Sequence, residues 1–158
     1  MRVYIMLLLL VVYQSVHAEE TLCTEKEKIV FSCHAKEKII SLCNSSQAEK
    51  NLIYRYGRIK HVELVYPENG KKTKNDFYRS TQMLFGGGEK SISFKRMSYE
   101  FKIYSKIGRS DSNDHQESRI PIYEDGLMLF QKDKLLKQFV CDDGGEGFRE
   151  DISWIPEN

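Results

Sequence analysis

Cysteine is the residue type with the clearest chemistry in this chain, and it occurs four times, at positions 23, 33, 43 and 141. In an oxidising compartment an even number of cysteines predicts two disulfides, and four cysteines allow three pairings. A structural zinc site is the alternative, because thiolates are also zinc ligands. However, Cys23, Cys33 and Cys43 lie ten residues apart and form no C-x-x-C pair. The spacing favours disulfides, and we expect neither a metal nor a cofactor.

The histidines offer a second kind of chemistry, general acid–base catalysis. After residue 18 the chain has His34, His61 and His115, in three separate segments. The chain contains neither the G-x-S-x-G turn of serine hydrolases nor the H-E-x-x-H helix of zinc proteases. A Ser-His-Asp arrangement forms in space rather than along the chain, so a secreted hydrolase stays a third hypothesis. We expect that the protein is not an enzyme.

Two glycine-rich segments resemble ligand loops without matching them. Gly86-Gly87-Gly88 is followed by Glu89 and a strand pattern, not by the G-K-[ST] and helix of a phosphate-binding loop. The simple interpretation is a turn or bulge, and the functional one is a loop whose backbone a partner approaches closely. The second segment, at residues 142–147, does not match the calcium-loop pattern. A solvated acidic segment is the expected state of these residues.

The first eighteen residues predict a secretory signal peptide. Arg2 precedes an apolar run from Tyr4 to Tyr13, and residues 16–18 have a small-x-small pattern typical of a cleavage site. A membrane-spanning helix needs about 20 apolar residues, twice the length of this run. We therefore expect that cleavage leaves a secreted or periplasmic protein with no stable membrane anchor.

Alternation of apolar and polar residues with a period of two dominates the rest of the chain and predicts strands. The first two strands, at 29–33 and 39–43, flank a turn and form a hairpin. Further short strands are expected at 52–56, 62–66, 77–85, 92–94, 99–104, 120–122, 127–131 and 135–141, with turn signals at Asn69-Gly70 and Asp125-Gly126. We predict an all-β fold, a small antiparallel meander, barrel or sandwich of about 8–10 strands, in one domain over residues 19–141. Pro121 suits an edge strand or a bulge, and a short helix at 132–139 is the alternative for the end of the domain.

Closure of such a meander suggests a disulfide pairing. When a meander closes, its first and last strands become neighbours, which places Cys33 close to Cys141 and leaves Cys23 with Cys43. The hairpin register sets Cys33 opposite Ile40, so that a bond between Cys33 and Cys43 is out of register. We expect the pairs Cys33–Cys141 and Cys23–Cys43.

Charge is balanced overall but unevenly placed. The net charge of +1 argues against a nucleic-acid partner, which usually requires a strong basic excess. Residues 55–79 are basic, and residues 142–158 form an acidic C-terminal tail. Two solvated surfaces are the simplest interpretation, and the alternatives are a tail lying on the basic face or a basic face meeting an anionic partner. The tail is expected to be mobile unless its apolar side chains dock onto the β domain, and these are Phe148, Ile152 and Trp154.

Several short motifs carry a resemblance to known proteins. They are F-S-C at 31–33, K-x-I-S-L-C at 38–43, Y-R-Y-G at 54–57, V-E-L-V-Y-P at 62–67, G-G-G at 86–88, I-S-F at 92–94 and Y-E-F-K-I-Y-S at 99–105. With Cys141 they resemble a group of small uncharacterised secreted proteins of Gram-negative bacteria, over most of residues 23–143, and this resemblance implies no activity. The layout is more distantly similar to that of the periplasmic inhibitors of C-type lysozyme, β-barrels with an aromatic-x-Cys segment near the start. Their inhibitory S-G-x-x-Y and W-x-K-G segments are absent here, so the resemblance implies architecture and no inhibitory residue.

The leading functional hypothesis is a non-catalytic binding module, such as an inhibitor, that recognises an unknown protein or small-molecule partner through its loops. The expected contact loops are 44–50, 67–76, 80–90 and 108–118, with candidate residues Gly86, Gly87, Gly88, Lys71, Lys72 and Lys74. The alternative is a carrier that holds a small apolar ligand inside a β-barrel. Its candidate lining residues are Tyr54, Tyr56, Phe94, Phe101 and Tyr104.

Overall fold

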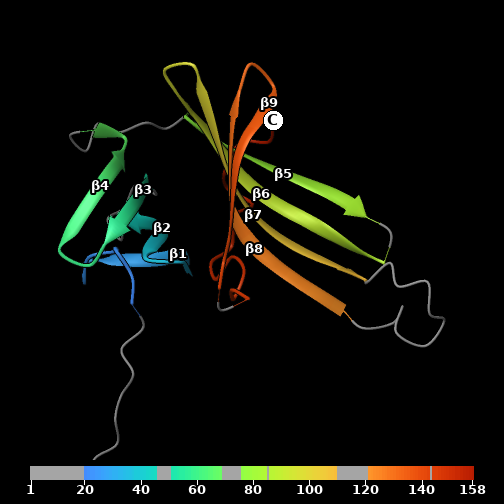
Figure 1. Ribbon diagram of the computed structural model, residues 1–158, viewed down its shortest axis with the longest axis horizontal. Coiled ribbons are helices and arrows are strands. Elements are labelled where there is room, and N and C mark those ends of the chain that lie inside the picture. Colours follow the sequence, from blue (N-terminus) through green and yellow to red (C-terminus); the bar gives the residue numbers. More distant parts are fainter. Residues whose placement is uncertain (1–19, 46–50, 69–75, 85, 110–120, 143) are drawn as a thin grey trace, which may run out of the picture.

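The computed structural model describes residues 20–45, 51–68, 76–84, 86–109, 121–142 and 144–158. These residues form nine strands in two antiparallel sheets, and none of them lies in an α-helix. The predicted all-β class is therefore confirmed. Figure 1 shows the smaller sheet beside the larger one, whose long strands extend well past it.

The first sheet, sheet A, is formed by consecutive strands in the order β1-β2-β3-β4. Its strands are β1 (Glu27–Ala35), β2 (Lys38–Ser45), β3 (Asn51–Arg58) and β4 (His61–Tyr66). The register of the first hairpin pairs Cys33 with Ile40, as the alternation pattern predicts. A two-residue turn, in which Lys36 has a φ of 58°, connects β1 to β2.

The second sheet, sheet B, is also a meander, in the order β5-β6-β7-β8-β9. Its strands are β5 (Phe77–Leu84), β6 (Gly87–Arg96), β7 (Tyr99–Arg109), β8 (Pro121–Gln131) and β9 (Lys134–Val140). The pairing of β9 with β8 reaches only as far as Gly126. Pro121 therefore opens β8 in a part of the strand that pairs with β7 on one side and, among the described residues, with no strand on the other, in agreement with the edge position expected for a proline.

Two sequence interpretations of sheet B are wrong. Asp125-Gly126 is not a hairpin turn but lies inside β8, where Tyr104 of β7 is the direct cross-strand partner of Gly126. A Cβ atom at Gly126 would lie 2.2 Å from the carbonyl oxygen of Phe139 and 2.9 Å from the Tyr104 hydroxyl, so close packing rather than a turn selects glycine. The alternative short helix at 132–139 is also wrong, because these residues form a turn followed by β9.

The turn between β8 and β9 has a sequence that does not suit its backbone. Both of its central residues have positive φ, 49° at Lys132 and 61° at Asp133. Two-residue turns of this kind favour Asn-Gly, because glycine adopts positive φ without steric cost. We expect the double variant Lys132→Asn, Asp133→Gly to raise the free energy of unfolding by about 1 kcal/mol and Tm by about 2–4 °C. Thermal unfolding followed by circular dichroism measures this, and the control Lys134→Gly, at the first residue of β9, is expected to lower Tm.

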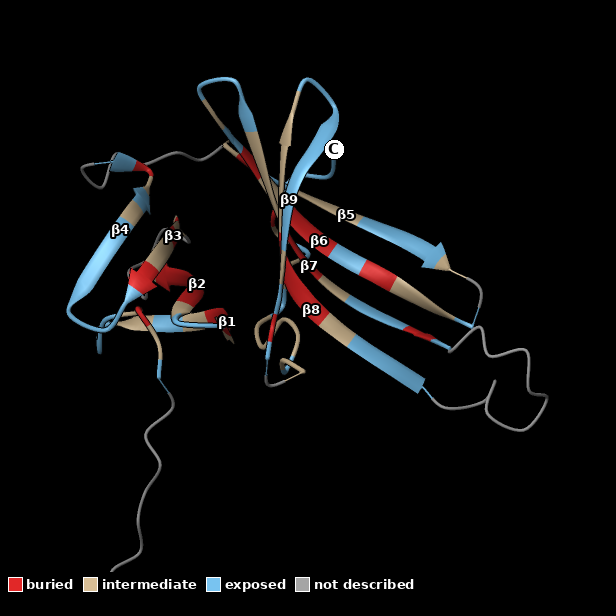
Figure 2. Cartoon of the chain, in the orientation of Figure 1, coloured by how far each residue is buried: buried red, intermediate tan, exposed pale blue. Residues whose placement is uncertain are grey.

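The two sheets share one hydrophobic core, which contains side chains from both. Aromatic rings fill its centre, where Phe94 of β6 lies 4.9 Å from both Tyr54 of β3 and Phe101 of β7, measured between ring centroids. Figure 2 shows buried positions in the middle of β6 and β8, and exposed positions at the outer ends of β5 and β8. Part of sheet B therefore extends beyond the core that sheet A covers.

Both disulfides have the connectivity expected from the sequence. Cys23 is bonded to Cys43, and Cys33 is bonded to Cys141. The argument from closure of a single meander is nevertheless incorrect, because β1 and β9 belong to different sheets and do not pair. Cys33 lies in β1 and Cys141 directly follows β9, so this bond joins sheet A to sheet B.

The C-terminal segment docks onto both sheets. Phe148, Ile152 and Trp154 pack against the core, and Ile155 is 2% exposed. The segment also covers the outer edge of β1, where the N–H of Asp142 donates to the carbonyl oxygen of His34 at 2.7 Å and that of Arg149 donates to Val30 at 2.9 Å. The tail was expected to be mobile unless its apolar side chains dock onto the β domain. Phe148, Ile152 and Trp154 all do so.

Candidate functional site

A groove of about 630 Å³ lies on sheet B, at the end of the sheet that extends beyond sheet A (Figure 1). It lies across β5, β6, β7 and β8, and the C-terminal segment forms one border. Its lining residues are Thr81, Gln82, Met83, Gly87, Gly88, Glu89, Lys90, Ser105, Ile107, Tyr123, Asp125, Gly144, Gly145, Glu146, Gly147 and Phe148.

An apolar row forms the outer part of this groove. In the sheet register Met83 is opposite Gly88, Gly88 is opposite Ile107, and Ile107 is opposite Tyr123. Directly opposite residues project from the same face of a sheet, so the three side chains share one surface. Gly88 has no side chain and leaves the space between Met83 and Ile107 open. The exposed fractions of Met83 and Tyr123 are 87% and 61%, so the row is accessible to a partner.

A polar row lies next to it, toward the core. It consists of the directly opposite residues Thr81, Lys90, Ser105 and Asp125. Asp125 is 3% exposed, and its Oδ2 accepts a hydrogen bond of 2.6 Å from the N–H of Gly147. A buried carboxylate requires such donors, because its charge is otherwise left without solvation. The C-terminal segment thus holds Asp125, the buried member of the polar row, in place.

The glycine-rich segment at residues 142–147 now has a structural explanation. Gly145 and Gly147 have φ values of +65° and +71°, and a Cβ atom at Gly145 would lie 2.0 Å from Oδ2 of Asp125. Glycine is therefore needed both for the backbone conformation and for the close approach. The segment directs a backbone N–H toward a carboxylate, whereas a calcium loop directs oxygens toward a cation.

The Gly86-Gly87-Gly88 motif serves backbone geometry and also contributes to the groove. Gly86 has a φ of +73°, and a Cβ atom at Gly87 would lie 1.9 Å from the carbonyl oxygen of Ile107. The simple interpretation of the motif is thus supported by both positions. Gly87 and Gly88 also line the groove, which places two of the candidate partner-binding residues there.

Other candidate contact positions lie outside the described residues. These are Lys71, Lys72 and Lys74 and most of the loops 44–50, 67–76 and 108–118. His115, which was considered for acid–base chemistry, also lies outside the described residues. The signal-peptide segment at 1–18 also lies outside them. The described end of the basic segment, Arg79, makes an ion pair of 3.1 Å with Glu157, so the acidic tail does reach part of the basic region.

The candidate ligand-lining residues lie mainly in the core. Tyr54 contacts both Phe94 and Phe101, and burial raises the pKa of its phenol strongly. Tyr56 packs edge-on against Phe139 at 5.8 Å. These rings are one another's neighbours and so fill the space between the sheets themselves.

Tyr104 is the fifth candidate lining residue. It lies three residues after Phe101 in β7, so the two side chains project from opposite faces of sheet B. Its hydroxyl donates to Oε1 of Glu124 at 2.9 Å and accepts from Nε2 of Gln138 at 2.7 Å. Burial is the main cause that raises the pKa of this phenol, and the hydrogen bond to Glu124 acts in the same direction. This side chain therefore belongs to a polar cluster away from the groove.

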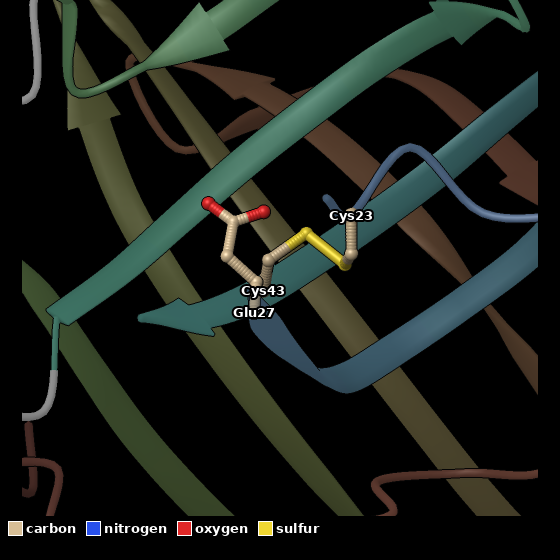
Figure 3. Close-up of side chains that lie close together, drawn as sticks. All are labelled: Cys23, Glu27 and Cys43. Atoms are coloured by element: carbon tan, nitrogen blue, oxygen red, sulfur yellow. A yellow bond between two sulfur atoms is a disulfide. The ribbon is translucent and has the colours of Figure 1, made fainter. Parts of the chain in front are cut away.

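One cluster of chemistry-bearing side chains was not anticipated from the sequence. Cys23, Glu27 and Cys43 lie together near one end of sheet A (Figure 3), and their ligand atoms are within 4.8 Å of one another. The two sulfurs are bonded to each other, so they are not thiolate ligands. Arg55 of β3 completes the cluster through two hydrogen bonds to the Glu27 carboxylate, at 2.7 and 2.9 Å, and one of 3.2 Å to the Cys43 sulfur. This arrangement is an ion pair beside a disulfide rather than a cation site.

The pKa of Glu27 reflects this pairing. Burial on its own raises the pKa of the carboxyl, because it disfavours the charged form. The hydrogen bonds from the Arg55 side chain and the Thr24 backbone, together with the positive charge of Arg55, act in the opposite direction and prevail. The net pKa is lowered, so Glu27 is charged at neutral pH.

The two described histidines are separate from the groove and from each other. His34 lies in β1, 3.4 Å from Glu20, while His61 opens β4 on the far side of β2 and β3. Neither lines the groove. The structure therefore gives these two residues no shared site.

Comparisons with known proteins add no relative: no protein-family model matches the sequence, and neither a curated protein nor a solved structure matches it. The described part of the chain contains no helix with the length and apolar character needed to cross a membrane.

Proposed function

We propose that this protein is an exported, non-catalytic binding module, in the periplasm or outside the cell, and that it holds a protein partner in the groove of sheet B. The observation that carries the proposal is the apolar row of Met83, Ile107 and Tyr123, exposed on one face of the sheet. Contiguous exposed apolar side chains with polar neighbours are typical of interaction sites.

Export is supported by the signal-peptide pattern and by the cysteines. All four cysteines are in disulfides, which persist in oxidising compartments and are rare in the cytosol. The resemblance to small secreted proteins of Gram-negative bacteria supports the same location. A fold with two covalent crosslinks also provides a rigid platform, which reduces the entropy that is lost on binding.

The carrier hypothesis draws no comparable support. Its central lining candidates, Tyr54, Phe94 and Phe101, contact one another between the sheets. A ligand placed among them would have to displace rings that are already packed, whereas the groove is open to solvent. We therefore assign partner binding to the groove.

Two methionines of equal exposure allow a matched test of this proposal. Met83 lies in the groove and Met97 in the β6–β7 turn at the other end of sheet B, and each is 87% exposed. The oxidised protein, residues 19–158, is immobilised and exposed to an envelope extract and culture fluid at moderate salt, alongside the variants Met83→Glu and Met97→Glu. We expect one stoichiometric protein to be retained by the wild type and by Met97→Glu, and at least 10-fold less of it by Met83→Glu. Equal retention by both variants, or none by the wild type, contradicts the proposal.

A further inference from the structure

Strand β5 forms one edge of sheet B, and this edge already accepts an extended segment of the chain itself. The N–H of Arg79 donates to the carbonyl oxygen of Pro156 at 2.8 Å, and the N–H of Asn158 donates to the carbonyl oxygen of Arg79 at 3.1 Å. Glu157 thereby forms a parallel bridge with Arg79. The edge is thus suited to pairing with an added strand.

The pattern of hydrogen bonds predicts which further groups of this edge are open. In an antiparallel pair, successive residues direct their N–H and C=O groups alternately toward the partner strand and away from it. Arg79 directs both groups away from β6, toward residues 156–158. Thr81 and Met83 follow at intervals of two without a register shift, so their N–H and C=O groups face the same side. Among the described residues, none forms a backbone hydrogen bond to these groups.

This edge lacks the features that usually prevent strand addition. Natural proteins protect exposed edges with charged side chains, proline or bulges. The run from Ser80 to Leu84 has no charge and no proline, and its pairing with β6 has no bulge. In contrast, the other edge strand of this sheet, β9, carries Lys134 and Lys137 and contains a register shift in its pairing with β8.

The open edge and the apolar row meet at the same residues. Met83 belongs to the row, and Thr81 and Met83 both line the groove. In a strand added beside them, alternate side chains project over this face of the sheet and the others point away from it. Such a strand therefore gains backbone hydrogen bonds from the edge and apolar contacts from the groove, which is the recognition mode of strand addition.

We propose that the partner supplies an extended segment that pairs with Thr81 and Met83 and becomes an additional strand of sheet B, in line with residues 156–158. This inference rests on the proposed function, since it names the way in which the groove holds its partner. The segment has apolar, β-branched side chains at alternate positions, which lie over the groove, and polar ones between them.

The probe for this proposal is a fluorescein-labelled octapeptide of alternating threonine and valine, with the same peptide N-methylated at every amide as its control. N-methylation removes the donors that pair with β5 and retains the side chains. We expect the unmodified peptide to bind the oxidised protein in fluorescence anisotropy, and the N-methylated peptide to bind at least 10-fold more weakly. The variant Met83→Pro removes one edge donor and is expected to weaken binding of the unmodified peptide by a similar factor, since an edge position tolerates proline.

Hydrogen exchange followed by NMR keeps the proposal testable if Met83→Pro does not fold. In the wild type, the peptide is expected to slow exchange of the Thr81 and Met83 amides at least 10-fold. No binding at millimolar peptide, equal binding of the two peptides, or unchanged exchange at these amides overturns the inference. Protection of the same amides by a concentration-dependent dimer, without peptide, also overturns it and identifies a second copy as the occupant. If Met83→Glu still loses the natural partner while the peptide tests fail, the proposed function stands and strand addition does not.

Discussion

Replacing both Cys33 and Cys141 with alanine is expected to lower the free energy of unfolding by about 4–5 kcal/mol, the largest effect that we predict for any pair of substitutions. The two residues are 108 positions apart, so the bond restricts most of the unfolded chain. It also joins β1 to the residue after β9, and thereby holds together two sheets that share no strand pairing. Both sulfurs are buried, so the substitution adds a small cavity to the entropic effect.

The second disulfide is the natural control for this experiment. Cys23 and Cys43 are separated by only 20 positions, and the double alanine variant is expected to lose about 3 kcal/mol. Urea unfolding of the wild type and both variants, followed by tryptophan fluorescence, measures the difference, because Trp154 packs against the core. If the two variants lose the same free energy of unfolding, the argument from loop length is contradicted. A larger loss in the variant without the Cys23–Cys43 bond contradicts it as well.

The hairpins of sheet A were predictable because they follow from local alternation. The residues around Cys33 and Ile40 alternate in polarity on both sides of a short turn, so the register follows from the turn position. The disulfide pairing was predicted correctly from an incorrect topology. The chain changes sheets between β4 and β5, and this change leaves no signal in the periodicity, which is the same in both sheets.

The wrong prediction of a hairpin turn at Asp125-Gly126 also has a cause that the local sequence does not show. A glycine after an aspartate is the usual signal for a hairpin turn. Here the glycine is required because Tyr104 and Phe139, from the two neighbouring strands, leave no space for a Cβ atom. The restriction acts across strands, so it becomes visible only when the register is known.

The groove was predictable in part. Gly87 and Gly88 have a local signal, the run of three glycines, and both line the groove. The apolar row next to them was not predictable, because Met83, Ile107 and Tyr123 come from three different strands. The Glu27–Arg55 pair was missed for the same reason: its members lie 28 positions apart, on two strands of sheet A that are not neighbours in the sheet.

That ion pair is the basis of the second large effect. The variant Arg55→Met is expected to lower the free energy of unfolding at pH 7 by about 3 kcal/mol, because it leaves a charged carboxylate without its partner. The Glu27 side chain is only 8% exposed, so water does not readily replace the two lost hydrogen bonds. The double variant Glu27→Gln, Arg55→Met removes the charge as well and is expected to be more stable than Arg55→Met alone.

The pH dependence separates this explanation from a simple loss of packing. In the wild type the pKa of Glu27 lies below its ordinary value of 4.5, so the pair contributes fully above that pH and its contribution is lost as the pH falls through the lowered pKa. In Arg55→Met, burial still raises the pKa of Glu27, but Arg55, which mainly opposed this effect, is gone. The cost of burying the charged carboxylate is therefore present at pH 7, and it is relieved when the carboxyl takes up a proton at lower pH. Urea unfolding at pH 7 and at about pH 5 is therefore expected to show a smaller difference between wild type and variant at the lower pH. A difference that does not change with pH would mean that Arg55 stabilises the fold through its contact with Cys43 of β2 rather than through its charge.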